Sequence, residues 1–329
     1  MNVESVYTAN AFQVDGKALV AAGSETTPQV YLQDMLSGEK CLVSDCPGGV
    51  MSFVPVPGNP DVFYSIMGLF PGFVGQEAGV FQHRRNGAEW TTVKAMPLPW
   101  AHRCDVIEKN GKCYLFGVSC SKFKAEPLDW SNASEIWAVE LDSDGNLLEP
   151  VLVDNNIYRN HGMLKTKVAG VDHLYISGAE GIFEIDMNAA GKWGLRQVFD
   201  KEVSEFGFVD LNGDGQEELV TIEPFHGENL NVYRKNEESW ELKFTGVLSF
   251  GHGLSCGVFN GQPVIVVGNR RGTYTLDMYT CDNLAEGKFT LTVLEEEAGP
   301  TQTLVFNVEG TDYILSANQK KNEVAVYSA

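Results

Sequence analysis

The feature that most constrains the fold of this 329-residue chain is a short unit that recurs seven times along it. Each unit is an apolar, β-branched run, a tight turn that contains glycine, and a second apolar run, as in CDVIEKNGKCYLFGV around Gly111. Paired runs on either side of such turns are typical of antiparallel strands. The turn glycines are Gly16, Gly58, Gly111, Gly170, Gly215, Gly261 and Gly310, at intervals of 42 to 59 residues. A repeat of this length predicts an architecture built from successive β-sheet units.

The units predict a propeller. In four of them an outer strand opens with an aromatic residue, at Trp90, Trp193, Trp240 and Phe289. Four short strands per unit are what the blades of a β-propeller require, and no stretch has a sustained helical period. We therefore predict an all-β fold, a seven-bladed β-propeller of four-stranded antiparallel blades, as one domain over residues 1–329. The last unit has no fourth strand after residue 327, so we expect an N-terminal strand to complete the last blade and close the ring.

One turn carries an acidic motif. Asp210, Asn212, Asp214, Gly215 and Glu218 form a D-x-N-x-D-G-x-x-E pattern, whose alternating oxygen ligands suit a hard cation such as Ca²⁺. Residues 217–222 then read as a strand, so the helix that follows an EF-hand loop is missing. A calcium-type loop between two strands resembles the FG-GAP/VCBS repeats of β-propellers. We expect a possible structural Ca²⁺ at 210–218 that braces its blade.

Composition limits the function classes. A formal charge of −20 argues against nucleic acid or an anionic membrane as a partner, since both carry negative charge. The N-terminus lacks the basic and apolar regions of a secretory signal, and no apolar run is long enough to span a membrane. Seven cysteines without a C-x-x-C pair fit reduced thiols. We therefore expect a cytoplasmic protein.

The histidines follow the repeat. His102, His161 and His252 each lie nine residues before a turn glycine, at the start of an innermost strand. His226 ends the second strand of its unit, which belongs to the same face of a propeller. Four of the six histidines are therefore expected at one mouth of the central channel. Convergent imidazoles suit a divalent metal (Mn, Mg, Ca or Zn), general acid–base chemistry, or both. The structural alternative is four histidines hydrogen-bonded between blades.

Polar and aromatic residues surround these histidines in the sequence. Two insertions, 68–79 and 119–135, fall between second and third strands and should rise on the histidine face. Their rings could stack on the apolar face of a sugar or simply anchor the loops. The polar neighbours include Arg103, Arg159, Arg270, Arg271 and Gln302, and the aromatic ones include Phe70, Phe73, Trp100, Phe123, Trp130 and Tyr158.

The chain also resembles FG-GAP-type propeller enzymes that act on sugars. It is similar to the propeller of aldos-2-ulose dehydratases and, in architecture, to the seven-bladed oligogalacturonate lyases, which hold a metal through His and Gln. The resemblance implies a metal-dependent carbohydrate lyase that eliminates from a small sugar, uronate or keto-glycoside. We then expect His161, His226 and His252 as metal ligands, His102 as base, and Arg103 or Arg271 facing the oxyanion. The expected substrate-binding residues are Trp100, Tyr158, Arg159, Arg270, Gln302 and Trp130.

Two other functions stay open. A glycoside hydrolase or lactonase could use the same metal, and a non-catalytic propeller could bind a sugar or a protein. Other enzyme motifs are missing from the sequence: it contains no phosphate-binding loop, no dinucleotide fingerprint and no G-x-S-x-G elbow.

Overall fold

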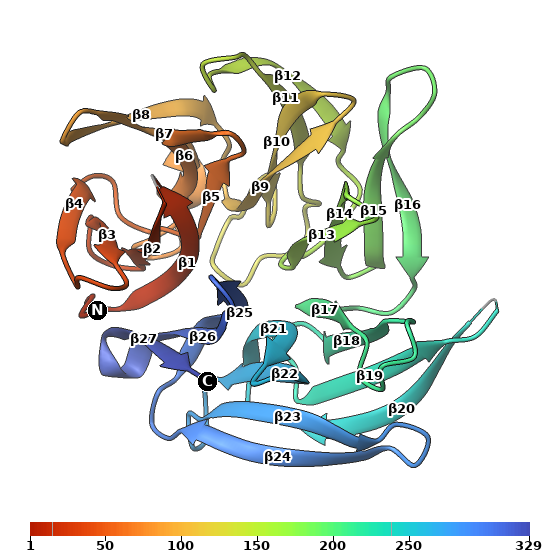
Figure 1. The fold of residues 1–329 in the computed structure, drawn as a ribbon. Helices are drawn as coiled ribbons and strands as arrows, with labels where there is room; N and C mark the ends of the chain where they lie inside the picture. The colour runs from red at the N-terminus through yellow and green to blue at the C-terminus, as the bar shows by residue number, and fades with distance from the viewer. Residues whose placement is uncertain (15, 238) are drawn as a thin grey trace. The chain divides into compact units, whose positions relative to one another are not determined.

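The structure is a computed structural model that describes residues 1–14, 16–237 and 239–329. Within these ranges the chain forms β-strands and two short 3₁₀ helices, and it contains no α-helix, as the sequence predicts (Figure 1). No helix in the described part of the chain has the length and apolar character needed to cross a bilayer.

The strands form seven consecutive antiparallel sheets, which confirms the predicted fold class of a seven-bladed β-propeller. Six sheets have four strands each, and the seventh has three. The chain divides into two compact units. Unit 1 comprises Met1–Ala11 and Glu202–Ala329, and unit 2 comprises Phe12–Lys201.

Blades 1 to 4 cover the part of the chain that makes up unit 2, together with the first residues of β1. Blade 1 contains β1 (Val6–Val14), β2 (Lys17–Ser24), β3 (Val30–Asp34) and β4 (Lys40–Ser44). Blade 2 contains β5 (Ser52–Val56), β6 (Asn59–Met67), the 3₁₀ helix η1 (Gly75–Glu77), β7 (Gly79–Asn86) and β8 (Glu89–Pro97). Blade 3 contains β9 (Ala101–Lys109), β10 (Lys112–Ser119), β11 (Ile136–Leu141) and β12 (Leu147–Asp154). Blade 4 contains β13 (Met163–Val168), β14 (Val171–Gly178), β15 (Gly181–Met187) and β16 (Trp193–Phe199).

Blades 5 to 7 belong to unit 1. Blade 5 contains β17 (Phe206–Val209), β18 (Glu218–Glu223), β19 (Asn229–Lys235) and β20 (Trp240–Val247). Blade 6 contains β21 (Gly251–Phe259), β22 (Gln262–Asn269), β23 (Leu276–Asn283) and β24 (Lys288–Glu295). Blade 7 contains β25 (Pro300–Val308), β26 (Thr311–Asn318), the 3₁₀ helix η2 (Gln319–Lys321) and β27 (Glu323–Ser328).

The N-terminus joins blade 7 over a shorter stretch than the sequence predicts. Asn2 forms a single antiparallel bridge with Glu323, and the Val3 N–H donates to the Asn322 carbonyl at 2.9 Å. From Val6 onward the chain belongs to β1 of the first blade. The edge of β27 is therefore covered by Met1–Val3 and not by a full strand, because the alternating run that follows is the inner strand of another sheet.

The tight turns explain why glycine marks the repeat. Asn110 and Gly111 have φ of 54° and 74°, and Asn260 and Gly261 have φ of 52° and 69°. Two successive residues with positive φ are typical of the type I′ turn, whose twist matches that of the strands that it joins. Asn and Gly are the residues that adopt this conformation at least cost.

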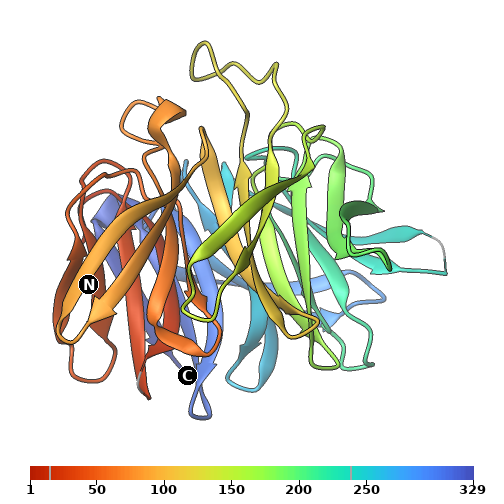
Figure 2. The ribbon, with the colours of Figure 1, turned by 90° about the horizontal axis from the view of Figure 1, so that it is seen from above.

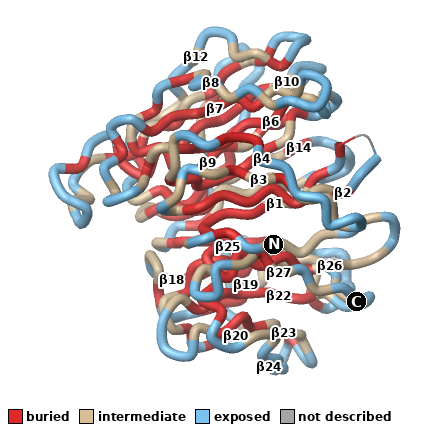
Figure 3. Tube along the Cα trace, turned by 90° about the vertical axis from the view of Figure 1, so that its left-hand side faces the viewer, coloured by how far each residue is buried: buried red, intermediate tan, exposed pale blue. Residues whose placement is uncertain are grey.

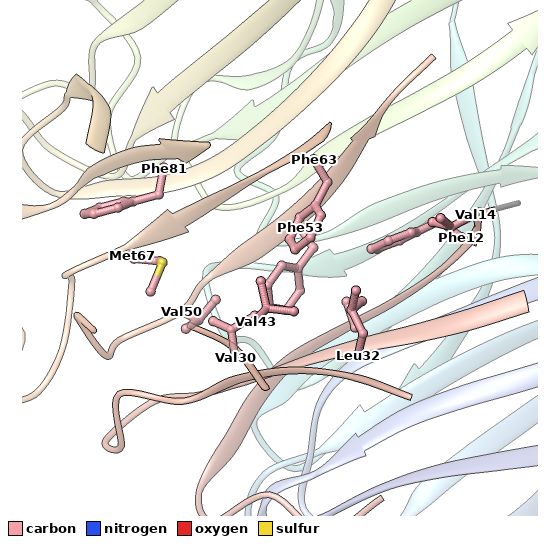
Figure 4. Packing of buried hydrophobic residues seen from close by; sticks show 11 residues of the cluster. Phe12, Val14, Val30, Leu32, Val43, Val50, Phe53, Phe63, Met67 and Phe81 are labelled. Carbon is pink, nitrogen blue, oxygen red and sulfur yellow. The ribbon is translucent and has the colours of Figure 1, made fainter. Parts of the chain in front are cut away.

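Apolar side chains fill the space between neighbouring blades. In unit 2, Phe12, Phe53 and Phe63 pack with Val30 and Leu32 between the sheets of blades 1 and 2 (Figure 4). Burial follows the strand positions in each unit: inner strands such as β22 are largely buried, whereas β24 contains no buried residue (Figure 3). Removal of this apolar surface from water is the main term that stabilises each pair of blades.

Candidate functional site

Unit 2 brings His102 and His161 together. His102 is the second residue of β9, and His161 lies just before β13; their ring centroids are 4.6 Å apart, and both residues are buried. Ser177 fixes the chain around His161, because its carbonyl accepts the His161 N–H at 3.2 Å and the Asn160 side-chain amide at 2.8 Å. His102 is therefore held by β9, and His161 is held by hydrogen bonds of its segment to β14.

Arg103 lies beside this pair and is buried. Its Nε donates to the carbonyl of His161 at 3.0 Å, and its Nη1 donates to the carbonyl of Met51 at 3.3 Å. The guanidinium thus ties blade 3 to its two neighbouring blades. Its role toward an oxyanion stays a prediction. Its hydrogen bonds to the His161 and Met51 carbonyls give it a structural role as well.

Unit 1 brings His226 and His252 together. Their rings stack with centroids 4.9 Å apart, and His226 also contacts Phe225 and Phe250, at 4.1 and 4.7 Å. His226 has a φ of 48°, in the left-handed region that non-glycine residues seldom adopt. Its neighbours hold it there, and such backbone conformations concentrate at functional sites.

Hydrogen bonds define the tautomer of His252. Nδ1 lies 2.6 Å from the carbonyl oxygen of Thr301, and a carbonyl can only accept, so Nδ1 carries the proton. In the neutral ring, Nε2 then keeps its lone pair, and this atom lies 3.2 Å from the Tyr7 hydroxyl. A buried imidazole whose second nitrogen donates to a backbone carbonyl is in the form that binds metals or accepts protons.

Tyr7 was missed by the sequence reasoning, although the register contained the signal. The count of nine residues that leads from Gly261 to His252 also leads from Gly16 to Tyr7 and from Gly310 to Thr301. Thr301 is buried, and its hydroxyl donates to the Tyr7 carbonyl at 2.7 Å, which holds the strand that carries the phenol. Neither residue is a histidine, so the histidine pattern alone does not locate them.

The remaining polar candidates differ in their contacts and in their exposure to solvent. In unit 1 the guanidinium carbon of Arg270 lies 5.8 Å from the centre of the Tyr7 ring, and that of Arg271 lies 4.5 Å from the centre of the Phe250 ring. Gln302 accepts hydrogen bonds from the Thr8 hydroxyl at 2.5 Å and the Ala9 N–H at 3.2 Å. In unit 2, Tyr158 is exposed and Arg159 is half-buried.

The two insertions of unit 2 rise on the same side of their blades, as predicted (Figure 2). Trp100 is buried and packs edge-on against Phe123, with ring centroids 5.6 Å apart, which favours the anchoring role over sugar stacking. Trp130 lies 6.2 Å from Phe73 of the other insertion, centroid to centroid. Lys124, which the sequence reasoning did not single out, places its amine 3.0 Å from the centre of the Trp130 ring.

The carboxylates of the acidic loop at 210–218 accept hydrogen bonds from the loop backbone and from Arg234. Both carboxylate oxygens of Asp210 accept backbone N–H groups, from Gly213 and from Gly215, at 2.8 Å. Arg234 donates to Asp214 at 2.6 Å and to Glu218 at 2.5 Å. The guanidinium thus pairs with two of the four predicted ligands, Asp214 and Glu218. Asn212 also donates to Asp214, and a cation at this site would have to replace these donors.

Two further histidines have structural partners in unit 2. His83 is buried between the hydroxyls of Ser65 and Thr92, each at 2.8 Å, and burial lowers its pKa to about 3. His173 lies 2.7 Å from a carboxylate oxygen of Glu184, near the hairpin turn of β13 and β14. These residues provide controls for the four candidate histidines.

Comparison with known proteins supports the fold alone. No protein-family model matches the chain, and no curated protein matches it. Among solved structures, a "putative 6-phosphogluconolactonase" from Bacteroides uniformis has 12% identity and a TM-score of 0.58, covering 91% of this chain and 87% of its own. Saccharomyces cerevisiae Sqt1 has 11% identity and a TM-score of 0.60, covering 98% and 84%. The Cps50 (Swd1) β-propeller domain of Myceliophteria thermophila has 9% identity and a TM-score of 0.61, covering 100% and 98%.

Proposed function

We propose that the protein is a metal-dependent carbohydrate lyase, with His161, His226 and His252 as metal ligands and His102 as general base. The observation that carries the proposal is the tautomer of His252. Nδ1 donates its proton to the carbonyl of Thr301, so the lone pair that can bind a metal is on Nε2. His226 is stacked on His252 within unit 1, and His102 is adjacent to His161 within unit 2. A bound divalent metal would supply a Lewis acid for the oxygen of an enolate.

The chain's own residues would carry the protons of the elimination. His102 removes the proton on the carbon next to a carbonyl or carboxylate, and the electron pair moves to that oxygen as an enolate. When the enolate collapses, the bond from the β-carbon to the leaving oxygen breaks and a carbon–carbon double bond forms. Tyr7 is the group that we assign to protonate the leaving oxygen, since its hydroxyl reaches the imidazole of His252.

Lactone hydrolysis is the second candidate. Two neighbours in fold are described as putative 6-phosphogluconolactonases from Bacteroides species, at 12% and 13% identity. The same metal, base and acid could activate a water molecule and protonate the ring oxygen of a lactone. This candidate uses the same histidines, so substrate and product distinguish it from the lyase.

A product assay on a panel of keto-glycosides, uronides and sugar lactones tests the proposal. A lyase produces ultraviolet absorbance from a new conjugated double bond, whereas a lactonase releases acid without it. We expect the absorbance to disappear with a chelator and with His102→Ala. Acid release without absorbance would replace the lyase by the lactonase, and turnover that persists with a chelator would contradict both.

A further inference from the structure

A separate feature of unit 2 is an aromatic cage formed by its two insertions. Phe73, from the segment between β6 and β7, and Trp130, from the segment between β10 and β11, meet edge to face at 6.2 Å. Phe70 supports Phe73 from behind, with ring centroids 5.2 Å apart. Asp129 fixes the second segment by accepting hydrogen bonds from the Ala125 and Ser131 N–H groups, both at 3.0 Å.

Lys124 occupies this cage. Its amine lies 3.0 Å from the centre of the Trp130 ring and 4.5 Å from the centre of the Phe73 ring, and the residue is only 4% exposed. No hydrogen-bond acceptor among the described residues reaches this nitrogen. An ammonium has three N–H donors, and each of them loses its water here without gaining an acceptor.

A primary ammonium is therefore a poor occupant of an otherwise favourable cation site. The faces of Trp and Phe attract any cation that approaches them, and a quaternary ammonium has no N–H group to satisfy. The net charge of −20 adds a long-range attraction for cations and none for anions. We propose that Phe73 and Trp130 form a binding site for a small quaternary ammonium compound, which displaces Lys124 as a resident plug.

The plug should tighten in mildly alkaline solution. Burial lowers the pKa of Lys124 from 10.5 to about 8, so the neutral amine is buried at less cost than the charged amine, while a quaternary ammonium keeps its charge at every pH. Two titratable groups of the same segment act on this amine. Burial raises the pKa of the Cys120 thiol to about 12, and hydrogen bonds, first that from Ala125, lower the pKa of Asp129 to about 2. Glu77 on the other segment is exposed and lies 3.6 Å from Lys94. Cys120 and Asp129 therefore titrate well outside the range in which Lys124 loses its proton.

Calorimetric titration with choline tests the proposal, with 3,3-dimethyl-1-butanol as the uncharged molecule of the same shape. We expect Lys124→Ala to bind choline at least about tenfold more tightly than the wild type, and the alcohol to bind neither protein. Lys122→Ala is the matched control, because Lys122 is an exposed lysine of the same segment. Adding Trp130→Ala to Lys124→Ala should abolish choline binding.

A pH series on the wild type makes the test independent of the variant's folding. Choline affinity of the wild type should fall as the pH rises from about 8 toward 10.5, because deprotonated Lys124 stays in the cage at less cost, and it should not change with pH in Lys124→Ala. Equal binding of choline and the alcohol would show an apolar pocket and overturn the cation site. Absence of choline binding by folded Lys124→Ala, or by the wild type at pH 7 if that variant does not fold, would also overturn it.

Discussion

Removal of the Tyr7 hydroxyl should affect catalysis far more than stability. We expect Tyr7→Phe to reduce turnover about 10²- to 10⁴-fold, the usual contribution of a general acid, because the leaving oxygen would receive no proton. In the metal-free protein the free energy of unfolding should fall by only about 1 kcal/mol, since the hydrogen bond between the Tyr7 hydroxyl and Nε2 of His252 is lost. Steady-state kinetics and urea unfolding give the two values.

Tyr313→Phe serves as the control, because Tyr313 lies on β26 of the same unit and stacks on Phe306. It should leave turnover unchanged. If Tyr7→Phe retained full activity with normal stability, Tyr7 would have no part in proton transfer and the acid would have to be another residue.

Lys124 provides a prediction about stability and pH. Its pKa is lowered in the folded protein, so the fold binds the charged form less well, and stability should rise as pH increases from about 8 toward the unfolded value of 10.5. Lys124→Met removes this cost. We expect the variant to exceed the wild type by about 1–2 kcal/mol at pH 7, with the difference shrinking toward zero near pH 10. Urea unfolding across this range measures it, and a difference that grows with pH would contradict the account.

The spacing of the repeat predicted the positions of the candidate histidines, which residue type alone could not do. The spacing from the turn glycines located His102, His161 and His252 at strand starts, and each lies at or just before an innermost strand. It could not indicate the burial of Arg103 or the position of Lys124, because both depend on contacts between segments distant in sequence.

Among the structural elements, the loop between β17 and β18 pairs its carboxylates with an arginine of the same blade. Glu218 is fully buried, and Arg234 is its charged partner. We expect Arg234→Ala to lower the free energy of unfolding by about 3 kcal/mol, because a buried carboxylate loses its counter-charge. If the loop can hold a cation, added Ca²⁺ should stabilise this variant more than it stabilises the wild type. Thermal unfolding with and without Ca²⁺ measures both effects.

Lys288→Ala is the control, because it breaks an exposed ion pair with Glu286. It should lower the free energy of unfolding by less than about 1 kcal/mol, and added Ca²⁺ should stabilise this variant and the wild type equally. A second change, Glu218→Gln in the Arg234→Ala background, should recover part of the lost stability. An Arg234→Ala variant as stable as the wild type would show that Arg234 does not neutralise the loop.

Strands and turns were the most predictable elements, because alternation and Asn-Gly turns are local properties of the sequence. The strand expected after the acidic loop is β18, and the predicted outer strands beginning near Trp90, Trp193, Trp240 and Phe289 are β8, β16, β20 and β24. The sequence overestimated the length of the N-terminal segment that pairs with blade 7. The run Val6–Val14 suits the innermost strand of blade 1 as well as the edge of blade 7. Only pairing partners decide between those two positions.

For the whole molecule, the seven sheets identify the fold, and the fold leaves the function open. Structures with 9–13% identity include lactonase candidates and a yeast protein, Sqt1, on the same architecture. Propellers host many unrelated functions, so function has to be argued from the site. The proposed function rests on the four histidines and on Tyr7.

The metal content of the purified protein decides whether these histidines form a metal site. Elemental analysis of the wild type, His161→Ala, His252→Ala and His173→Gln compares two proposed ligands with a histidine that pairs with Glu184. We expect a stoichiometric divalent metal in the wild type and in His173→Gln, and its loss from both His161→Ala and His252→Ala while they stay folded. A wild type that binds no metal, or a His252→Ala variant that retains the full amount, would contradict it.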